Sequence, residues 1–266
     1  MLVVHPLYSS SSGNMFHIAT NNTNILIDVG VSYKAINDGL KSIGLDIKEI
    51  DAVLITHEHI DHIKGLPLLC RKNDIPVYAC LETAGYIQEE FSAKNIEGNL
   101  HAIEYDKPFL IKDIEICAFE TSHDAVMPCG YKITDLTDEK TITFATDLGF
   151  VSPNVLDNFK VSDYAILESN YDDTMLQFGK YPYPLKQRIR GIKGHLSNDA
   201  CGETLATLAK EGHNRFLIAH MSENNNNIEI AKQTLESTLL QNGINLDNIE
   251  LSFASKTLSS EEYTIC

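Results

Sequence analysis

The sequence predicts an α/β (α+β) chain in which two mixed β-sheets pack face to face between outer layers of helices, a four-layer αββα sandwich. Short apolar runs with strand character alternate with helical segments along the whole chain. Each half contains an apolar strand that ends in an aspartate, Asp28 in the first half and Asp147 in the second. Each half then continues as alternating strands and helices that end in histidines. Two similar halves of this kind favour two sheets that share one core.

The individual elements are bounded by turn and capping residues. Ser32 can cap a helix to about Ile43, and Ser197 can cap a helix to Lys210. Further helices are expected over 65–72, 82–91 and 228–240. Strands are expected over 2–7, 15–19, 24–30, 52–55, 76–79, 101–111, 114–121, 129–134, 141–145, 164–170, 215–219, 249–253 and 263–265, with a small-residue loop over 9–14. No linker, composition shift or repeat divides the chain, so a single domain over residues 1–266 is expected.

Composition limits the classes of function. The net charge of −16 excludes a protein that coats nucleic acid or anionic membrane through its whole surface. The six cysteines form no C-x-x-C pair, which favours a reducing compartment. No apolar stretch approaches the length of a membrane span, so a cytoplasmic protein that does not bind membrane is expected.

The densest group of metal-ligand side chains directly follows the apolar strand Ala52 to Ile55. His57 and His59 are two residues apart, and on extended chain such residues project to the same side and can share one cation. Asp61 and His62 then turn away and can hold a second cation. Nitrogen and oxygen ligands suit zinc first, with manganese or iron as alternatives, because no thiolate is present to narrow the choice.

The spacing His-x-His-x-Asp-His closely resembles the signature of the metallo-β-lactamase-fold hydrolases. The resemblance implies two divalent metal ions and completes their ligand sets. His123, which follows a strand, would be the third ligand of the first metal, and His220 would be the last ligand of the second. Asp147 would bridge the two ions, while Asp28 would lie under the site and orient a ligand histidine.

Such a site implies hydrolysis, because a bound cation lowers the pKa of a bridging water toward ~7 and makes hydroxide available, with Asp61 helping to orient it. A phosphodiester substrate is favoured by the absence of a cysteine ligand. A basic run in an otherwise acidic chain also favours it, since it offers cations to a phosphate backbone through Lys186, Arg188, Arg190 and Lys193.

Glu168 and the later Gly194-His195-Leu196-Ser197 resemble the glutamate and histidine pair of ribonuclease Z. The resemblance implies that His195 donates a proton to the departing oxygen while Glu168 fixes its tautomer. Taken whole, the chain looks like the bacterial YycJ-type (VicX- or WalJ-type) branch of the fold, through Ser-Gly-Asn near the start, Glu168-Ser169-Asn170 and His220-Met221-Ser222. That branch is associated with DNA exonuclease activity, and Ser222 joins the expected substrate-binding residues.

Nucleic acid, with DNA favoured, is therefore the expected partner, bound through the local basic segment. Two alternatives stay open: a small-molecule hydrolase acting on a cyclic phosphodiester, lactone or thioester, and a metal-binding protein without turnover. The sequence leaves the native metal, the cleavage polarity and the oligomeric state undetermined.

Overall fold

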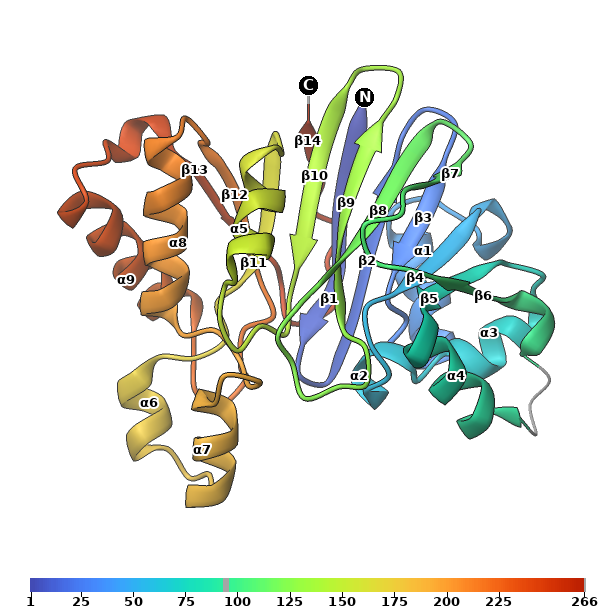
Figure 1. Cartoon of the computed structure of the whole chain (residues 1–266), viewed down its shortest axis with the longest axis horizontal. Helices are drawn as coiled ribbons and strands as arrows, with labels where there is room; N and C mark the ends of the chain where they lie inside the picture. The colour runs from blue at the N-terminus through green and yellow to red at the C-terminus, as the bar shows by residue number, and fades with distance from the viewer. Residues whose placement is uncertain (93–95, 266) are drawn as a thin grey trace.

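Two β-sheets pack face to face at the centre of the protein, with helices outside both (Figure 1). The computed structural model describes residues 1–92 and 96–265, and within these residues each sheet has seven strands. This arrangement confirms the predicted αββα class. The core between the sheets is apolar, as expected for two sheet faces that are both removed from water.

The first sheet has the strand order β14-β1-β2-β3-β4-β5-β6. Its strands from β1 to β3 pair antiparallel, whereas β3 to β6 pair parallel. The sheet is therefore mixed, and the carboxyl ends of β3 and β4 lie at the same edge. The strands are β1 (Leu2–Ser10), β2 (Gly13–Ala19), β3 (Asn24–Ile27), β4 (Ala52–Ile55), β5 (Val77–Cys80), β6 (Leu100–Ile103) and β14 (Tyr263–Ile265).

The second sheet has the order β13-β12-β11-β10-β9-β8-β7 and repeats this plan. Its strands from β7 to β10 pair antiparallel, and β10 to β13 pair parallel. The strands are β7 (Phe109–Ile111), β8 (Ile114–Glu120), β9 (Cys129–Asp135), β10 (Lys140–Ala145), β11 (Tyr164–Glu168), β12 (Arg215–Ala219) and β13 (Glu250–Phe253).

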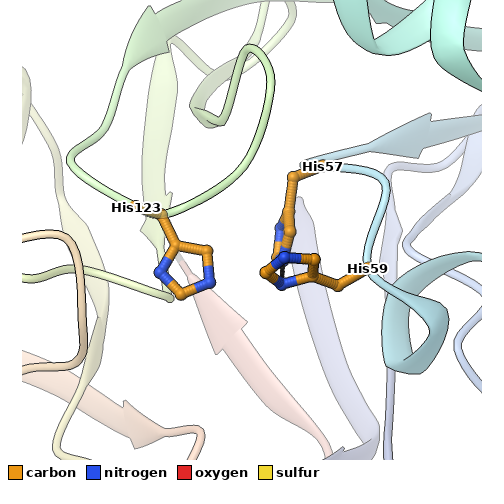
Figure 2. Close-up of side chains that lie close together, drawn as sticks. All are labelled: His57, His59 and His123. Atoms are coloured by element: carbon orange, nitrogen blue, oxygen red, sulfur yellow. Dashed lines mark hydrogen bonds between the residues drawn. The ribbon is translucent and has the colours of Figure 1, made fainter. Parts of the chain in front are cut away.

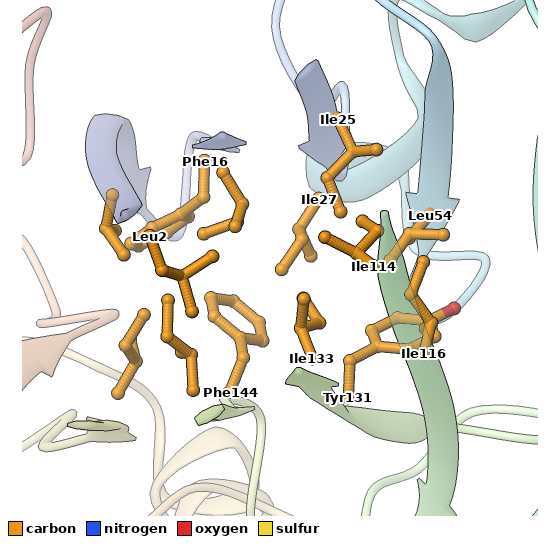
Figure 3. Packing of buried hydrophobic residues seen from close by; sticks show 14 of the residues in the cluster. Leu2, Phe16, Ile25, Ile27, Leu54, Ile114, Ile116, Tyr131, Ile133 and Phe144 are labelled. Atoms are coloured by element: carbon orange, nitrogen blue, oxygen red, sulfur yellow. The ribbon is translucent and has the colours of Figure 1, made fainter. Parts of the chain in front are cut away.

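The inner faces of the two sheets form one hydrophobic core. Figure 3 shows Phe16, Ile27 and Leu54 from the first sheet opposite Tyr131 and Phe144 from the second, all of them buried. The ring of Phe16 contacts the ring of Phe144 edge to face, with their centroids 5.0 Å apart. This contact ties β2 to β10 and so fixes the two sheets, and the strand ends they carry, relative to each other.

Helices cover the outer face of each sheet. The first sheet packs against α1 (Tyr33–Ser42), α3 (Leu66–Lys72) and α4 (Leu81–Glu90), and the second against α5 (Pro153–Lys160), α8 (Asn198–Lys210) and α9 (Ile228–Gln241). The short helices α6 (Asp173–Phe178) and α7 (Tyr183–Arg190) project below the sandwich in Figure 1. The described residues also form α2 (Ile60–Ile63) and the 3₁₀ turns Ile47–Glu49, Glu97–Asn99 and Leu246–Asn248.

The predicted capping residues begin their helices as expected. Ser32 Oγ accepts a hydrogen bond from Ala35 N, and Ser197 Oγ accepts one from Ala200 N. The loop predicted over 9–14 is wrong in extent, since β1 continues to Ser10 and β2 begins at Gly13. Pairing along this hairpin keeps Ser9 and Asn14 opposite each other as strand residues.

The helices α5, α6 and α7 have no counterpart in the sequence-based assignment. Each is short, and α6 and α7 bury a single residue apiece, Leu176 and Ile189, so that neither produces a clear apolar period. The start of α5 does carry a local signal, because Ser152 caps it and Pro153 occupies the first turn.

Candidate metal centre

Polar side chains gather where parallel strands of both sheets end. Asp28 follows β3 and His57 lies just beyond β4, while Asp147 follows β10, Glu168 is the last residue of β11 and His220 follows β12. Because β3 and β4 are neighbours in one sheet and β10, β11 and β12 in the other, their carboxyl ends bring these side chains to one edge of the sandwich.

Three histidines form the first cluster, with their imidazoles turned toward one another in Figure 2. His57 and His59 come from the loop after β4, and His57 Nε2 lies 3.1 Å from His59 Nδ1. His123 comes from the loop after β8, with its ring centroid 5.0 Å from that of His57. Burial lowers the pKa of His57 and of His123, so both rings are held neutral with a nitrogen lone pair free for a cation.

Two of these rings are oriented by bonds to their other nitrogen. Thr56 Oγ1 lies 3.0 Å from His57 Nδ1, and His123 Nδ1 donates to the carbonyl oxygen of Gly194 at 3.0 Å. Such contacts fix the tautomer and leave Nε2 facing the cluster. The structure therefore brings together the three residues that the sequence predicts for the first metal.

The second cluster consists of Asp61, His62 and His220. His62 is fully buried, and its Nδ1 donates to Asp28 Oδ2 at 2.7 Å, which is the orienting contact predicted for Asp28. Its Nε2 lies 3.6 Å from Asp61 Oδ2. Burial opposes charge on His62, but the surrounding carboxylates of Asp28, Asp147 and Asp61 outweigh it and raise the pKa to about 10. The same negative field favours a cation at this position.

The carboxylate of Asp147 lies between the two clusters. Its Oδ2 is 3.4 Å from His62 Nε2, and its Oδ1 is 3.7 Å from His123 Nε2. Burial opposes ionisation of Asp147, yet the four histidines around it hold the pKa of this carboxyl well below its usual range. One buried carboxylate with an oxygen near each cluster is the arrangement that a bridging ligand requires.

Glu168 is fully buried and contacts two histidines rather than the one predicted. Its Oε1 accepts from His195 Nδ1 and from His220 Nδ1, each at 2.8 Å. Its Oε2 accepts from the backbone N–H groups of Leu148 and Leu196. Burial opposes charge on His195, but Glu168 outweighs it and raises the His195 pKa. A single carboxylate thus orients a candidate ligand and a candidate proton donor together.

Three of the residues at this edge have left-handed backbone, with φ of 60° at Asp28, 57° at Asp147 and 53° at His220. Residues other than glycine rarely adopt this conformation, and it persists where neighbours hold it. His220 N donates to Ser9 Oγ at 2.8 Å, and Asn170 Nδ2 donates to the His220 carbonyl oxygen at 2.9 Å. The backbone bend aims the His220 ring at the cluster.

The sequence predicts no role for Ser9, Asn14 or Asn170. Ser9 and Asn170 hold the backbone of His220, and Asn14 Nδ2 lies 3.2 Å from His62 Nε2, on the side that faces the second cluster. The signal in the sequence is weak: Ser9 and Asn14 bound the small-residue stretch 9–14, and Asn170 ends Glu-Ser-Asn. Their positions depend on β1, β2 and β11 meeting at the same edge.

The predicted basic segment mostly bonds within the chain. Arg188 pairs with Asp124, with Nη2 3.1 Å from Oδ1, and Arg190 pairs with Asp173 at 3.1 Å. Lys186 donates to the backbone carbonyls at the end of α6. Only Lys193, of these four cations, has no hydrogen-bond or ion-pair partner within residues 1–92 and 96–265. The segment therefore offers a phosphate fewer free cations than its composition indicates.

Ser222 is buried two residues beyond His220. Its hydroxyl accepts from Asn224 N and Asn225 N, so it stabilises the turn that follows the second cluster. A contact between Ser222 and substrate stays a prediction.

Comparison with known proteins identifies the family. The model of the beta-lactamase superfamily domain matches residues 23–221. The chain belongs to this superfamily. It is 34% identical over 245 residues to exodeoxyribonuclease YycJ of Bacillus anthracis, which covers 89% of each protein. It is 35% identical over 236 residues to exodeoxyribonuclease WalJ of Streptococcus pneumoniae, covering 88% of this chain and 87% of that protein.

Solved structures of low sequence identity show the same fold. The metallo-beta-lactamase fold protein YhfI from Bacillus subtilis aligns with a TM-score of 0.72 and 16% identity over 98% of both chains. Zinc-bound PqqB from Methylobacterium extorquens aligns with a TM-score of 0.73 and 16% identity over the whole of both chains. Among the residues described, no helix combines the length and the apolar character needed to cross a bilayer.

The beta-lactamase superfamily fold implies divalent metal ions, and the residues present fit them. His220 Nε2 and Asp147 Oδ2 are buried without a hydrogen-bond partner among the described residues, which is costly unless another ligand satisfies them. The side chains around them offer only nitrogen and oxygen atoms, the ligands of zinc, manganese and iron. These two atoms belong to His220 and Asp147, for which the family resemblance implies positions at the second metal and at the bridge.

Proposed function

We propose that this protein is a metal-dependent phosphodiesterase that removes nucleotides from the ends of DNA. The observation that carries the proposal is the position of the Asp147 carboxylate, which has one oxygen beside each cluster. A carboxylate placed in this way suits a dinuclear site, which hydrolytic enzymes use for displacement at phosphorus. His57, His59 and His123 would hold one ion, and Asp61, His62 and His220 the other.

Divalent cations at such a site supply Lewis acidity and a nucleophile at neutral pH. The chain's own residues do the rest. Asp61 is only partly buried, so its free carboxylate oxygen can accept a hydrogen bond from the attacking water and orient it. Asp28, fixed by Thr56, keeps the His62 ring in place.

His195 is the residue we assign to leaving-group protonation. Its Nδ1 is bonded to Glu168, and its side chain remains 19% exposed, so Nε2 is free to reach the substrate. The Glu168 carboxylate outweighs burial and raises the pKa of His195, which favours the protonated ring that a general acid requires. His195 lies beside the seven candidate ligands and is not needed to complete either ligand set.

DNA is proposed as the substrate because two relatives that align with most of this chain are named exodeoxyribonucleases. A second candidate function is hydrolysis of a small phosphodiester. It is favoured by a cavity of about 480 Å³ beside His123, which lies within the size range of small-ligand sites.

The test is an assay of single- and double-stranded DNA and RNA, labelled at either the 5′ or the 3′ end, with zinc or manganese. The proposal expects progressive shortening of DNA from one end and loss of activity in Asp147→Asn. Turnover of small diesters without any cleavage of polynucleotides would instead support the second candidate. Zinc is the first choice of metal, since the nitrogen-rich clusters suit it, and manganese is the alternative.

A further inference from the structure

A cavity of about 480 Å³ opens directly beside the first histidine cluster. We call it the His123 cavity, because His123 contributes to its wall. Its other lining residues include Ser122, Phe150 and Lys193, together with Tyr105, Glu82 and Glu120. A ligand bound there would lie beside His123, a candidate metal ligand.

The wall around His123 is built from three loops that are bonded to one another. Gly149 N donates to Ser122 O at 2.7 Å, Ser122 Oγ donates to Ile192 O, and His123 Nδ1 donates to Gly194 O. Gly149 has to be glycine, since a Cβ there would lie 2.1 Å from Ile192 O. These bonds join the loops that carry His123, Phe150 and Lys193, so this part of the cavity is preformed.

Two side chains in the wall are left free for a ligand. The Phe150 ring is 44% exposed beside the cavity. Lys193 has no partner among the described residues, in contrast to Arg188 and Arg190, which pair with acids. A half-exposed aromatic ring can stack on a nucleobase, and a free ammonium can bind a phosphate.

The charge of the lining indicates how much of a strand can enter. Glu82 and Glu120 line the cavity with Lys193 as the one cation among its lining residues. Several phosphates in this cavity would be repelled by the two carboxylates, whereas the amino groups of a nucleobase can donate hydrogen bonds to them. The lining therefore suits one nucleoside with a single phosphate near Lys193.

We propose that the His123 cavity binds the terminal nucleoside of the substrate strand, with Phe150 stacked on its base and Lys193 facing the adjacent phosphate. The proposal rests on the proposed nuclease function, because it places the scissile phosphate at the metal centre. It adds that the end nucleotide enters unpaired and that the product is a mononucleotide.

The test measures binding of single-stranded deoxyoligonucleotides whose terminal residue is either normal or abasic, at the 5′ or the 3′ end. Metal-loaded protein carrying His195→Ala is used, so that cleavage does not interfere. Removal of the base at one end should weaken binding about tenfold or more, the range found for base stacking on an aromatic ring. Adding Phe150→Ala should abolish this dependence on the base.

Phe178→Ala is the matched control, since Phe178 is 79% exposed on α6 and lines a different groove. It should leave the dependence on the terminal base intact. The proposal is overturned if removing the terminal base weakens binding equally in proteins with Phe150 and with Phe150→Ala. It is also overturned if the protein does not bind the oligonucleotides. Thermal unfolding of each variant shows whether it is folded. If Phe150→Ala does not fold, Lys193→Met replaces it as the test, and it should weaken binding to normal and abasic ends alike.

The two proposals fail separately. If unmodified protein cleaves no polynucleotide while binding depends on the terminal base through Phe150, the nuclease function is wrong and the nucleoside site stands. If DNA is shortened from an end without that dependence, the nuclease function stands and the His123 cavity does not bind the terminal base.

Discussion

Glu168 and His195 are 27 residues apart in the chain, and in the fold Glu168 Oε1 lies 2.8 Å from His195 Nδ1. The carboxylate is fully buried and the imidazole is partly exposed. The pair therefore fixes one nitrogen of the ring and leaves the other free. His195 Nδ1 also lies 3.6 Å from Asp147 Oδ1, within a group of side chains that could hold a metal, so experiment has to distinguish a proton donor from a ligand.

His195→Ala should leave metal bound and slow the cleavage of native phosphodiesters by roughly 10²–10⁴-fold, the range expected when a general acid is removed. The defect should shrink for a nitrophenyl diester, because nitrophenolate departs without a proton. Metal content and both rates are measured on the same preparation.

His220→Ala is the matched control for that experiment. His220 contacts the same Glu168 oxygen but belongs to the second cluster, so its loss should lower metal content and activity together. Loss of metal in His195→Ala would make His195 a ligand. An identical defect on both substrates would show that it is not the acid.

Protein purified without chelator should contain close to two equivalents of transition metal per chain, measured by elemental analysis. Asp147→Asn should lose more than one equivalent, because the carboxylate lies beside both clusters. Asp124→Asn is a useful comparison, since Asp124 lies near His123 but is 30% exposed and paired with Arg188. Saturation of the unmodified protein at a single ion would contradict the dinuclear site.

Lys193→Met should weaken binding of single-stranded DNA and reduce the slope of log affinity against log salt by about 0.7, the value for one phosphate contact. Arg190→Met should change the slope less, because Arg190 already pairs with Asp173. Binding is measured by titration at several salt concentrations. A larger change in Arg190→Met than in Lys193→Met would show that the ion pair opens to receive the phosphate.

The free energy of unfolding should fall in mild acid because of a buried pair of histidines, His5 on β1 and His17 on β2. His17 Nδ1 lies 3.0 Å from His5 Nδ1, and burial lowers the pKa of His17 to about 4. Between pH 6.5 and 4 the unfolded chain binds a proton that the folded chain does not, so the free energy of unfolding falls as the pH falls. The loss should approach roughly 3 kcal/mol near pH 4.

His17→Gln is the variant that checks this prediction by urea unfolding at several pH values. It removes the titrating group and keeps a side chain able to bond Asn24. The difference in stability between the two proteins should therefore depend on pH, shrinking or reversing toward pH 4. A constant difference between pH 7 and pH 4 would mean that His17 does not drive the acid sensitivity.

Local sequence was sufficient for the elements whose signals are local. Ser197 begins α8 at the predicted position, and β12 spans the predicted residues, because capping and short apolar runs act over a few neighbouring positions. The His57 to His62 spacing was informative for the same reason. Four candidate metal ligands lie within these six positions, directly after one buried strand.

The sequence by itself determined the αββα class and indicated which residues offer metal-ligand atoms. Only the tertiary structure decided how close Asp147 lies to each cluster, that Glu168 contacts His220 as well as His195, and that Arg188 and Arg190 are paired with acids. These relationships join residues distant along the chain, and their distances depend on how the two sheets pack. Charge along a sequence shows which groups are present, whereas folding decides which of them remain free, as Lys193 does among the described residues.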